Sequence, residues 1–361
     1  MFKRVADRLR RPETEDGIKN MLKLAVIGFG WWGQHVTKRL QGHPSIQVTC
    51  VAETDSHLHP AIVAAGVEPV SKLEAALARR DVMAVVLTTP HMLHEEQVCT
   101  VAAAGRHVFC EKPLAMTATG AARAVAAARS AGVVLGVGHE RRFEPGMQRL
   151  KAMLAAGDLG TPLHAEVAFS HDKLKDLPIG GWRTSAELSP GAGMTGMGIH
   201  LTDLLIWLLG PVATVQAQIR DRVLRWPTGD MVVAQMSHEG GATSHLNAIL
   251  CTPLSIRLQL YGSDGWVELR NVSHPDTAGG VTEWVHMPAS GVADHKILPA
   301  IDSVVANLEA FAGAIAGKAP YPWTDHELIH NIGIYEAIVA SAHSNSTISP
   351  RTLGANPRVS I

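Results

Sequence analysis

The sequence predicts an N-terminal α/β domain with a parallel sheet, followed by an α+β domain with a large, mostly antiparallel, open-faced sheet. Three observations support this fold class. The chain has 361 residues, which is long for one ordinary domain and suits two. Up to about residue 141, short apolar runs alternate with helical patterns, and later segments alternate between polar and apolar residues. We therefore predict an N-terminal extension (1–20), the α/β domain (21–141), the α+β domain (142–345) and a C-terminal tail (346–361).

The first domain shows the order of elements that is typical of a parallel sheet. Its first strand is the apolar run 24–27, and Gly105 and Gly132 are placed to end two of its helices. Strands that alternate with helices in this way form a parallel sheet with helices on both faces. In chain order the predicted elements are strand 24–27, helix 33–40, strands 48–52 and 82–87, helix 95–104, strand 107–110, helix 121–131 and strand 133–137.

The second domain is predicted to contain a sheet with one exposed face. In 215–220 and 255–261 apolar side chains fall at every second position, as in half-buried strands. The helices 201–209 and 300–316 are expected to cover one face of this sheet. The other face is a natural surface for self-association, so we expect a homodimer or a tetramer made of such dimers. Further predicted elements are the helix 147–156 and the strands 231–236, 244–250 and 265–269.

Composition argues against several classes of partner. Charged residues make up 18% of the chain and the formal net charge is −1, so no nucleic-acid surface is indicated. No apolar run approaches the ~20 residues that a membrane helix needs. The four cysteines form no CxxC pair and are expected to be reduced thiols, which suits the cytoplasm, and the scattered 19 histidines indicate no metal site. Residues 1–20 lack the apolar core of a secretory signal, so we expect a loose extension or a true start at Met21.

The segment from Gly28 to Gly33 reads GFGWWG and matches the GxGxxG pattern of a Rossmann dinucleotide site. It follows a predicted strand and opens a predicted helix, which is the context that the pattern requires. Gly28 permits the tight turn, Gly30 lets the main chain approach a pyrophosphate, and Gly33 lets helix and strand pack closely. The helix N-terminus then faces the phosphates. The predicted loop residues are Gly28, Phe29, Gly30, Trp31, Trp32 and Gly33.

An acidic residue follows the second strand at the distance that this pattern predicts. Glu53 lies twenty residues after Gly33. Its carboxylate can accept hydrogen bonds from both ribose hydroxyls of adenosine and would repel a 2′-phosphate. The next residues, Thr54 to Ser56, include no arginine or lysine. The cofactor is therefore predicted to be NAD rather than NADP.

Four further segments resemble, in the same order, the motifs of one enzyme family. They are Thr89 to His94 (TPHMLH), Glu111 to Pro113 (EKP), Gly138 to Phe143 (GHERRF) and Gly191 to Asp203 (GAGMTGMGIHLTD). Together with the glycine loop they resemble the glucose–fructose oxidoreductase / inositol dehydrogenase (Gfo/Idh/MocA) family, from about Met21 to the 340s. The family's usual fold agrees with the two domains predicted above.

The resemblance implies catalytic roles for two residues. Lys112 matches the lysine that reaches the substrate hydroxyl and the nicotinamide, and a lysine in a mostly apolar stretch would otherwise be a costly burial. His200 matches the histidine that works beside it on the alcohol proton, for which an intrinsic pKa near ~6.5 is suited; the alternative is a core histidine. Glu111 would position the cofactor ribose or Lys112. The resemblance further implies cofactor contacts by Thr88, Thr89, Pro90, His94, Glu111 and Lys112, and substrate contacts by Arg141, Trp182, Arg183, Gly196, His200 and Asp203.

One position departs from the family pattern. Inositol dehydrogenase-like members usually carry aspartate four residues before the histidine, in GGxxxDxGxH, and this chain has Gly196 there. Glycine cannot bind a hydroxyl or assist proton transfer, so recognition of a polyol is in doubt, and a negative charge that would repel an acidic substrate is gone. Candidate partners for a substrate carboxylate are Arg141, Arg142 and Arg183, although Arg142 also suits a structural role and Arg183 a cofactor contact or a surface charge. Alternatively, Gly196 only allows close helix packing.

These observations predict an NAD-dependent dehydrogenase with a small-molecule substrate. It would transfer a hydride between nicotinamide and a secondary alcohol or ketone of a sugar, a cyclitol or a carboxylated ring diol. Two alternatives remain: an enzyme that recycles bound NAD in lyase or glycosidase chemistry, and a non-catalytic NAD-binding regulator. Lys112 and His200 argue against the regulator, whereas Gly196 favours it.

Overall fold

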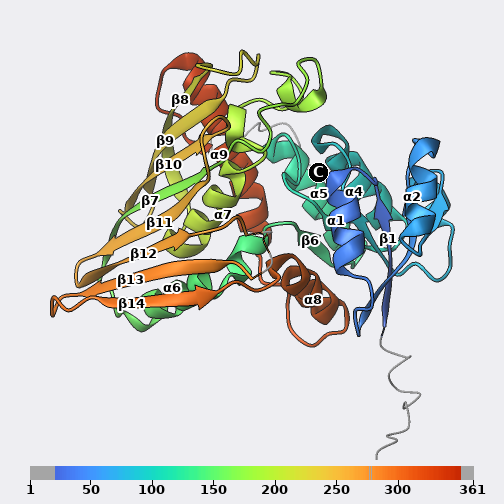
Figure 1. Ribbon diagram of the computed structural model, residues 1–361, viewed down its shortest axis with the longest axis horizontal. Coiled ribbons are helices and arrows are strands. Elements are labelled where there is room, and N and C mark those ends of the chain that lie inside the picture. The colour runs from blue at the N-terminus through green and yellow to red at the C-terminus, as the bar shows by residue number, and fades with distance from the viewer. Residues whose placement is uncertain (1–20, 276, 278, 351–361) are drawn as a thin grey trace, which may run out of the picture.

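The computed structural model describes residues 21–275, 277 and 279–350. Figure 1 shows two bodies side by side, a broad sheet with helices along its inner side and, next to these helices, a second group of strands and helices formed largely by the N-terminal part of the chain. The predicted fold class is confirmed. The predicted extension 1–20 and residues 351–361 of the predicted tail lie outside the described residues.

The first domain is built on a six-stranded parallel sheet, as the alternation of strands and helices predicted. Its strand order is β3-β2-β1-β4-β5-β6, the order of the doubly wound Rossmann fold. Successive residues of the apolar strand β1 enter different cores, Leu24 and Val26 on one face and Ala25 and Ile27 on the other, so both faces are buried. The strands are β1 (Leu22–Ile27), β2 (Ile46–Ala52), β3 (Glu68–Val70), β4 (Ala84–Leu87), β5 (His107–Cys110) and β6 (Leu135–Val137).

The helices that connect these strands include three of the predicted ones and two that the sequence did not indicate. The segments α2, β3 and α3 span only six, three and five residues, which is too short for a recognisable periodic pattern. Helix α1 begins two residues earlier than predicted, inside the glycine loop. The helices are α1 (Trp31–Arg39), α2 (His59–Ala64), α3 (Leu73–Leu77), α4 (His94–Ala103) and α5 (Ala118–Ser130).

The second sheet has eight strands in the order β14-β13-β12-β11-β7-β10-β9-β8. Neighbouring strands are antiparallel except β7 and β10, which run parallel. Strands β7, β13 and β14 were not predicted. In β11 the alternation has a physical cause, because Ile256 and Leu258 are buried while Arg257 between them is only partly covered. The strands are β7 (Pro162–Ser170), β8 (Val212–Arg220), β9 (Met231–His238), β10 (Thr243–Ile249), β11 (Ser255–Gly262), β12 (Gly265–Asn271), β13 (Val281–Pro288) and β14 (Asp294–Pro299).

The helices that follow the first domain pack on both sheets. As predicted, α7 (Gly198–Leu209) packs on the second sheet against β7 and β10, and the unpredicted α9 (Asp325–Ser344) packs against β8, α7 and α5. Helix α6 (Pro145–Ala156) contacts β14. The prediction that helix 300–316 covers the second sheet is wrong. This helix, α8 (Ser303–Ile315), packs on the Rossmann sheet, since its buried apolar side chains Val304, Leu308 and Phe311 share a core with β1 and β4.

One face of the second sheet remains open. Among the described residues, no helix lies on the face that points away from α7 (Figure 1). On this face Arg257 of β11 forms an ion pair with Glu166 of β7. This agrees with the open-faced sheet that the sequence predicted. None of the helices within 21–350 is both long and apolar enough to cross a membrane.

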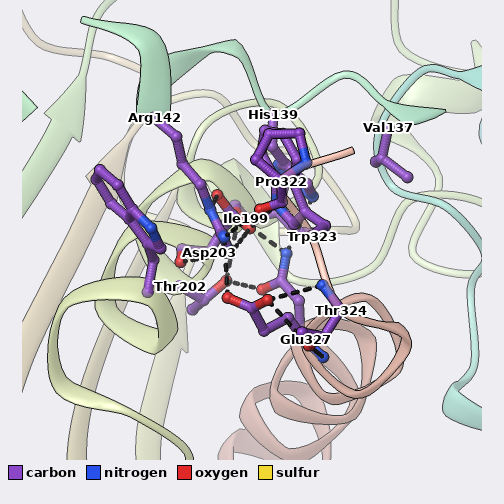
Figure 2. A network of polar contacts seen from close by, with 12 residues as sticks. Val137, His139, Arg142, Ile199, Thr202, Asp203, Pro322, Trp323, Thr324 and Glu327 are labelled. Atoms are coloured by element: carbon purple, nitrogen blue, oxygen red, sulfur yellow. Dashed lines mark hydrogen bonds and ion pairs between the residues drawn. The ribbon is translucent and has the colours of Figure 1, made fainter. Parts of the chain in front are cut away.

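A buried ionic network joins the end of the first domain to two helices of the second (Figure 2). Arg142 lies in the short helix η3 (Glu140–Phe143) and donates two hydrogen bonds to the Asp203 carboxylate of α7, at 2.7 and 2.8 Å. It donates a third, of 2.9 Å, to Glu327 of α9, and the indole of Trp323 donates to Asp203. Because α7 also carries His200, this network sets the position of that histidine relative to the Rossmann domain.

Candidate active site

A cleft of about 1350 Å³ lies between the Rossmann domain and the second domain. One wall consists of the loops at the carboxyl ends of β1, β2, β4 and β5, and the other comes mainly from the segment 169–200. The strand order of the Rossmann sheet reverses between β1 and β4, where ligands of such sheets bind. The cleft is bridged at one point, because the ring of Trp182 meets the ring of His91 edge-on at 4.6 Å between centroids.

The glycine loop has the geometry that a dinucleotide requires. Gly28 adopts a φ of +91°, which side chains rarely tolerate. A Cβ on Gly33 would collide with the carbonyl oxygen of Gly28, whereas a Cβ on Gly30 would meet nothing within 4 Å. Gly33 therefore allows close packing of helix and strand, and Gly30 faces open space at the N-terminus of α1. Among the predicted loop residues, Gly28, Gly30, Trp31 and Trp32 line the cleft, and Phe29 and Gly33 lie behind it.

Glu53 is held at the edge of the cleft by main-chain donors. Its carboxylate accepts hydrogen bonds from the N–H of Phe29 at 2.7 Å and from the N–H of Asp55 at 2.9 Å. The side chain is thereby fixed beside the glycine loop before any ligand arrives. A carboxylate at this point, a loop open at Gly30 and the N-terminus of α1 together fit an adenosine ribose and a pyrophosphate.

The loops after β4 and β5 are joined by a buried histidine. The two ring nitrogens of His94 lie 2.7 Å from the carbonyl oxygen of Pro113 and 3.0 Å from that of Thr89. Burial lowers the pKa of His94, so the ring is neutral and donates to only one of these oxygens. Thr88 donates to the main chain of β1 and Gly28. His94 and Thr88 thus position the loop that presents Thr89 and Pro90 to the cleft.

Lys112 reaches from the end of β5 across to the second domain. Its Nζ donates hydrogen bonds to the carbonyl oxygens of Gly196, at 2.9 Å, and Thr195, at 3.4 Å. The preceding Glu111 is buried, which raises the pKa of its carboxyl to about 7. A Cβ on Gly138 would collide with that carboxylate, so the glycine of the GHERRF segment makes room for Glu111.

His200 is the third residue of α7 and lines the same cleft. Only 4% of the residue is exposed, and its ring packs perpendicular to that of His139 at 5.7 Å between centroids. Burial first, and then the positive charge of Lys112, hold the pKa of His200 well below its usual value. The imidazole is therefore neutral at neutral pH and is able to accept a proton. Lys112 and His200, far apart in sequence, line one end of the cleft together.

Two of the predicted substrate contacts are not in the cleft. Arg141 is buried, pairs with Glu144 at 2.7 Å and donates to Asn271. Asp203 is the buried partner of Arg142 in Figure 2. A buried guanidinium or carboxylate is stable only with charged or hydrogen-bonding partners, which a sequence does not reveal. Of the two roles considered for Arg142, a substrate contact and a structural role, the structure shows the structural one.

The remaining predicted contacts do line the cleft. Trp182 and Arg183 lie in the short helix η4 (Trp182–Thr184), with the Arg183 guanidinium 4.1 Å from the centroid of the Trp182 ring. Sequence reasoning missed several cleft residues, namely Glu140, His171, Lys173 and His274. Glu140 lies in the GHERRF segment beside Arg141, whereas the other three lie in loops without a recognisable pattern. No group of three or more potential metal ligands occurs within the described part of the chain.

The fold and the cleft define the class of protein, an NAD-binding oxidoreductase. Residues 22–139 match the family model described as "Oxidoreductase family, NAD-binding Rossmann fold", and residues 147–268 match the "GFO/IDH/MocA C-terminal domain". The chain belongs to the GFO/IDH/MocA family, as the resemblance in its motifs predicted.

Similar proteins carry names from sugar and cyclitol chemistry. The 1,5-anhydro-D-fructose reductase of Ensifer adhaerens is 29% identical over 276 residues, which are 76% of this chain and 81% of that protein. The inositol 2-dehydrogenase of Ralstonia nicotianae is 32% identical over 243 residues, 66% of this chain and 64% of that protein. A solved structure of levoglucosan dehydrogenase in complex with NADH has a TM-score of 0.81 at 20% identity, covering 91% of this chain and 99% of that one. At this low identity, the similarity to levoglucosan dehydrogenase supports the fold alone.

Proposed function

We propose that this protein is an NAD-dependent dehydrogenase that oxidises a secondary alcohol of a sugar, a cyclitol or a carboxylated ring diol, or reduces the corresponding ketone. The observation that carries this proposal is the meeting of Lys112 and His200 in one cleft with the glycine loop and Glu53. The names of the relatives support the class of substrate.

Different residues would bind the cofactor and transfer the proton. The glycine loop, Glu53 and the loop presenting Thr89 and Pro90 would hold NAD, which supplies the acceptor for the hydride when it is bound. The ammonium of Lys112 is placed to orient the alcohol oxygen and to stabilise negative charge on it. His200, neutral through burial, takes the hydroxyl proton, so the alcohol loses a hydride and a proton and becomes a ketone.

The charges in the cleft favour a substrate that bears an anionic group. Beyond the glycine loop, the cleft is lined by the cationic side chains Lys112, Lys173 and Arg183, and on the acidic side by Glu140 and by Glu111, whose pKa burial raises to about 7. With Arg141 and Arg142 engaged elsewhere, Arg183 is the arginine left for a carboxylate from the three proposed by sequence. A carboxylated ring diol or sugar acid suits these charges better than a neutral polyol.

A substrate screen tests the proposal directly. Purified protein with NAD would be offered panels of sugars, inositols, hydroxy acids and carboxylated dihydrodiols, and NADH absorbance would be recorded. A net dehydrogenase accumulates NADH in proportion to substrate consumed. Conversion of substrate without NADH would instead indicate recycling of bound cofactor, and binding of NAD without any conversion would indicate a regulator.

Cofactor preference provides the first prediction. We expect NAD to bind at least about tenfold more tightly than NADP, because the Glu53 carboxylate would repel a 2′-phosphate. Titration calorimetry with both cofactors measures this ratio. The Glu53→Gln variant should narrow the ratio, since the amide removes the charge and keeps the side-chain shape. Equal or tighter binding of NADP by the unaltered protein would contradict the prediction.

Self-association provides the second prediction. The outward face of the second sheet carries none of the described helices, and such a face is commonly covered by another subunit. We propose that two copies pair through this face to give a homodimer, or a tetramer of such dimers. Light scattering at micromolar concentration should therefore give at least twice the 38.5 kDa mass of the chain. A monomer mass would exclude this assembly.

A further inference from the structure

The place of the family's aspartate is open in this chain. A Cβ built on Gly196 would meet only the Cδ1 atom of Leu174, at 3.9 Å, which is ordinary contact. Neighbouring glycines differ, because a Cβ on Gly198 would collide with Met194. Packing therefore gives no reason for glycine at 196, and the alternative of close helix packing is not supported. The site lacks a carboxylate on this wall without having lost the space for one.

A different carboxylate lies beside His200. Glu140 begins the short helix η3, directly after the Rossmann domain, and lines the cleft. Its Oε2 lies 3.9 Å from Nδ1 of His200, with 12% of the Glu140 side chain and 5% of the His200 side chain exposed. The Nδ1 atom is buried and has no hydrogen-bond partner among the described residues. Since Nδ1 is enclosed, Nε2 is the nitrogen left to meet a substrate.

We propose that Glu140 takes the place of the missing aspartate: it is a positioning residue that accepts the Nδ1–H of His200 and leaves Nε2 unprotonated toward the substrate hydroxyl. This inference rests on the proposed dehydrogenase function. In the oxidation the hydroxyl proton goes to Nε2, and the imidazolium that forms is stabilised by the Glu140 carboxylate.

The physical reason is the choice between two tautomers. A neutral imidazole has one N–H, and the hydrogen bond made by one nitrogen decides which nitrogen is protonated. A carboxylate at Nδ1 selects the tautomer whose Nε2 accepts a proton, as in other histidine–carboxylate pairs. The separation of 3.9 Å exceeds a hydrogen bond, and catalytic hydrogen bonds are often long before the ligand binds.

The surroundings of His200 disfavour its protonated form, and a neighbouring carboxylate would oppose that effect. Burial disfavours the protonated form of its ring most, and the positive charges of Lys112 and Arg141 add to this effect. The ring is therefore neutral before reaction, and the contact with Glu140 is between a carboxylate and a neutral ring. Proton transfer to this ring would create a cation beside other cations. Glu140 supplies an opposing charge within ~4–6 Å, where a neighbouring charge alters proton affinity most.

The first experiment reads the tautomer without cofactor or turnover. In protein with ¹⁵N-labelled histidine, the nitrogen chemical shifts of His200, assigned with the His200→Asn variant, distinguish Nδ1–H from Nε2–H at neutral pH. We expect Nδ1–H in the unaltered protein and a shift toward Nε2–H in Glu140→Ala. Glu187→Ala, which removes an exposed carboxylate outside the cleft, is the matched control. An unchanged His200 tautomer in folded Glu140→Ala, established by thermal melting, would overturn the proposal.

The second experiment removes the carboxylate at position 140 and introduces one at position 196. Glu140→Gln should lower kcat about tenfold with little change in KM, since losing the charge lowers the pKa of His200 by about one pH unit. The acid limb of the pH profile should move to lower pH. Adding Gly196→Asp should recover most of the lost kcat. Because the carboxylate introduced by Gly196→Asp would also repel an anionic substrate, the recovery is read in kcat rather than KM.

The outcomes separate this inference from the proposed function. If no panel substrate yields NADH, the dehydrogenase proposal fails, and the tautomer measurement still decides whether Glu140 pairs with His200. If the enzyme is active and Glu140→Gln changes neither kcat nor the pH profile, the role of Glu140 is wrong while the function stands. If the double variant shows no recovery, Glu140 does not replace the family's aspartate.

Discussion

Replacing Lys112 by alanine is expected to lower turnover by about 10²-fold or more, the usual scale for losing a donor that stabilises developing negative charge on the reacting oxygen. The ammonium bridges the two domains by donating to the carbonyl oxygens of Gly196 and Thr195, which places it at the catalytic end of the cleft rather than along the glycine loop. The affinity for NAD should therefore remain nearly unchanged. Initial rates of NADH formation and calorimetry with NAD measure the two quantities.

Variants of the neighbouring residues give the controls for Lys112. His200→Ala should also lower turnover, and by less than Lys112→Ala if Lys112 is the direct base. If His200 takes the proton, as its burial and neutral ring favour, the two losses should be similar in size. Full turnover in Lys112→Ala would show that the role carried over from the family does not apply to this chain.

Breaking the buried network in Figure 2 is expected to have the largest effect on stability. Asp203→Leu should lower the free energy of unfolding by about 3–5 kcal/mol, because it leaves the buried Arg142 guanidinium without its bidentate partner. The Trp323 indole would lose its acceptor as well. Urea denaturation followed by circular dichroism measures the loss.

A double variant separates the buried charge from the packing. Arg142→Met with Asp203→Leu replaces both ions by apolar side chains and should recover most of the loss, since a buried pair can be replaced at little cost. Glu327 keeps its hydrogen bonds to Thr324 in that variant. A double variant as unstable as Asp203→Leu alone would show that volume and shape, rather than an unpaired charge, account for the effect. In the single variant α7 loses its tie to η3, so turnover should fall together with stability.

Local sequence patterns were sufficient for most of the fold. The apolar run before Gly28 and the alternation in β11 predict a buried parallel strand and a half-buried strand, because burial on one or two faces leaves a periodic trace in the sequence. The glycine loop and Glu53 could also be predicted, since the tight turn and the ribose contact require particular residues at particular spacings. Elements as short as β3 leave no such trace.

Only the tertiary structure decided which side chains meet. An apolar helix face looks the same whichever sheet it covers, so the sequence could not show that α8 packs on the Rossmann sheet. Arg141 and Asp203 stood in motifs with the residues of the cleft, yet their partners Glu144 and Arg142 hold them in the interior.

The region around His200 also combines a feature that the sequence determines with one that only the tertiary structure decides. The sequence by itself determined that position 196 has no aspartate, because that is a matter of residue identity. The approach of Glu140 to Nδ1 of His200 depends on how η3 and α7 are held together by Arg142, across sixty residues of chain. Residue types and spacings determine the local structure of each segment. Charge pairing and burial depend instead on which other segments pack against that segment in the folded protein.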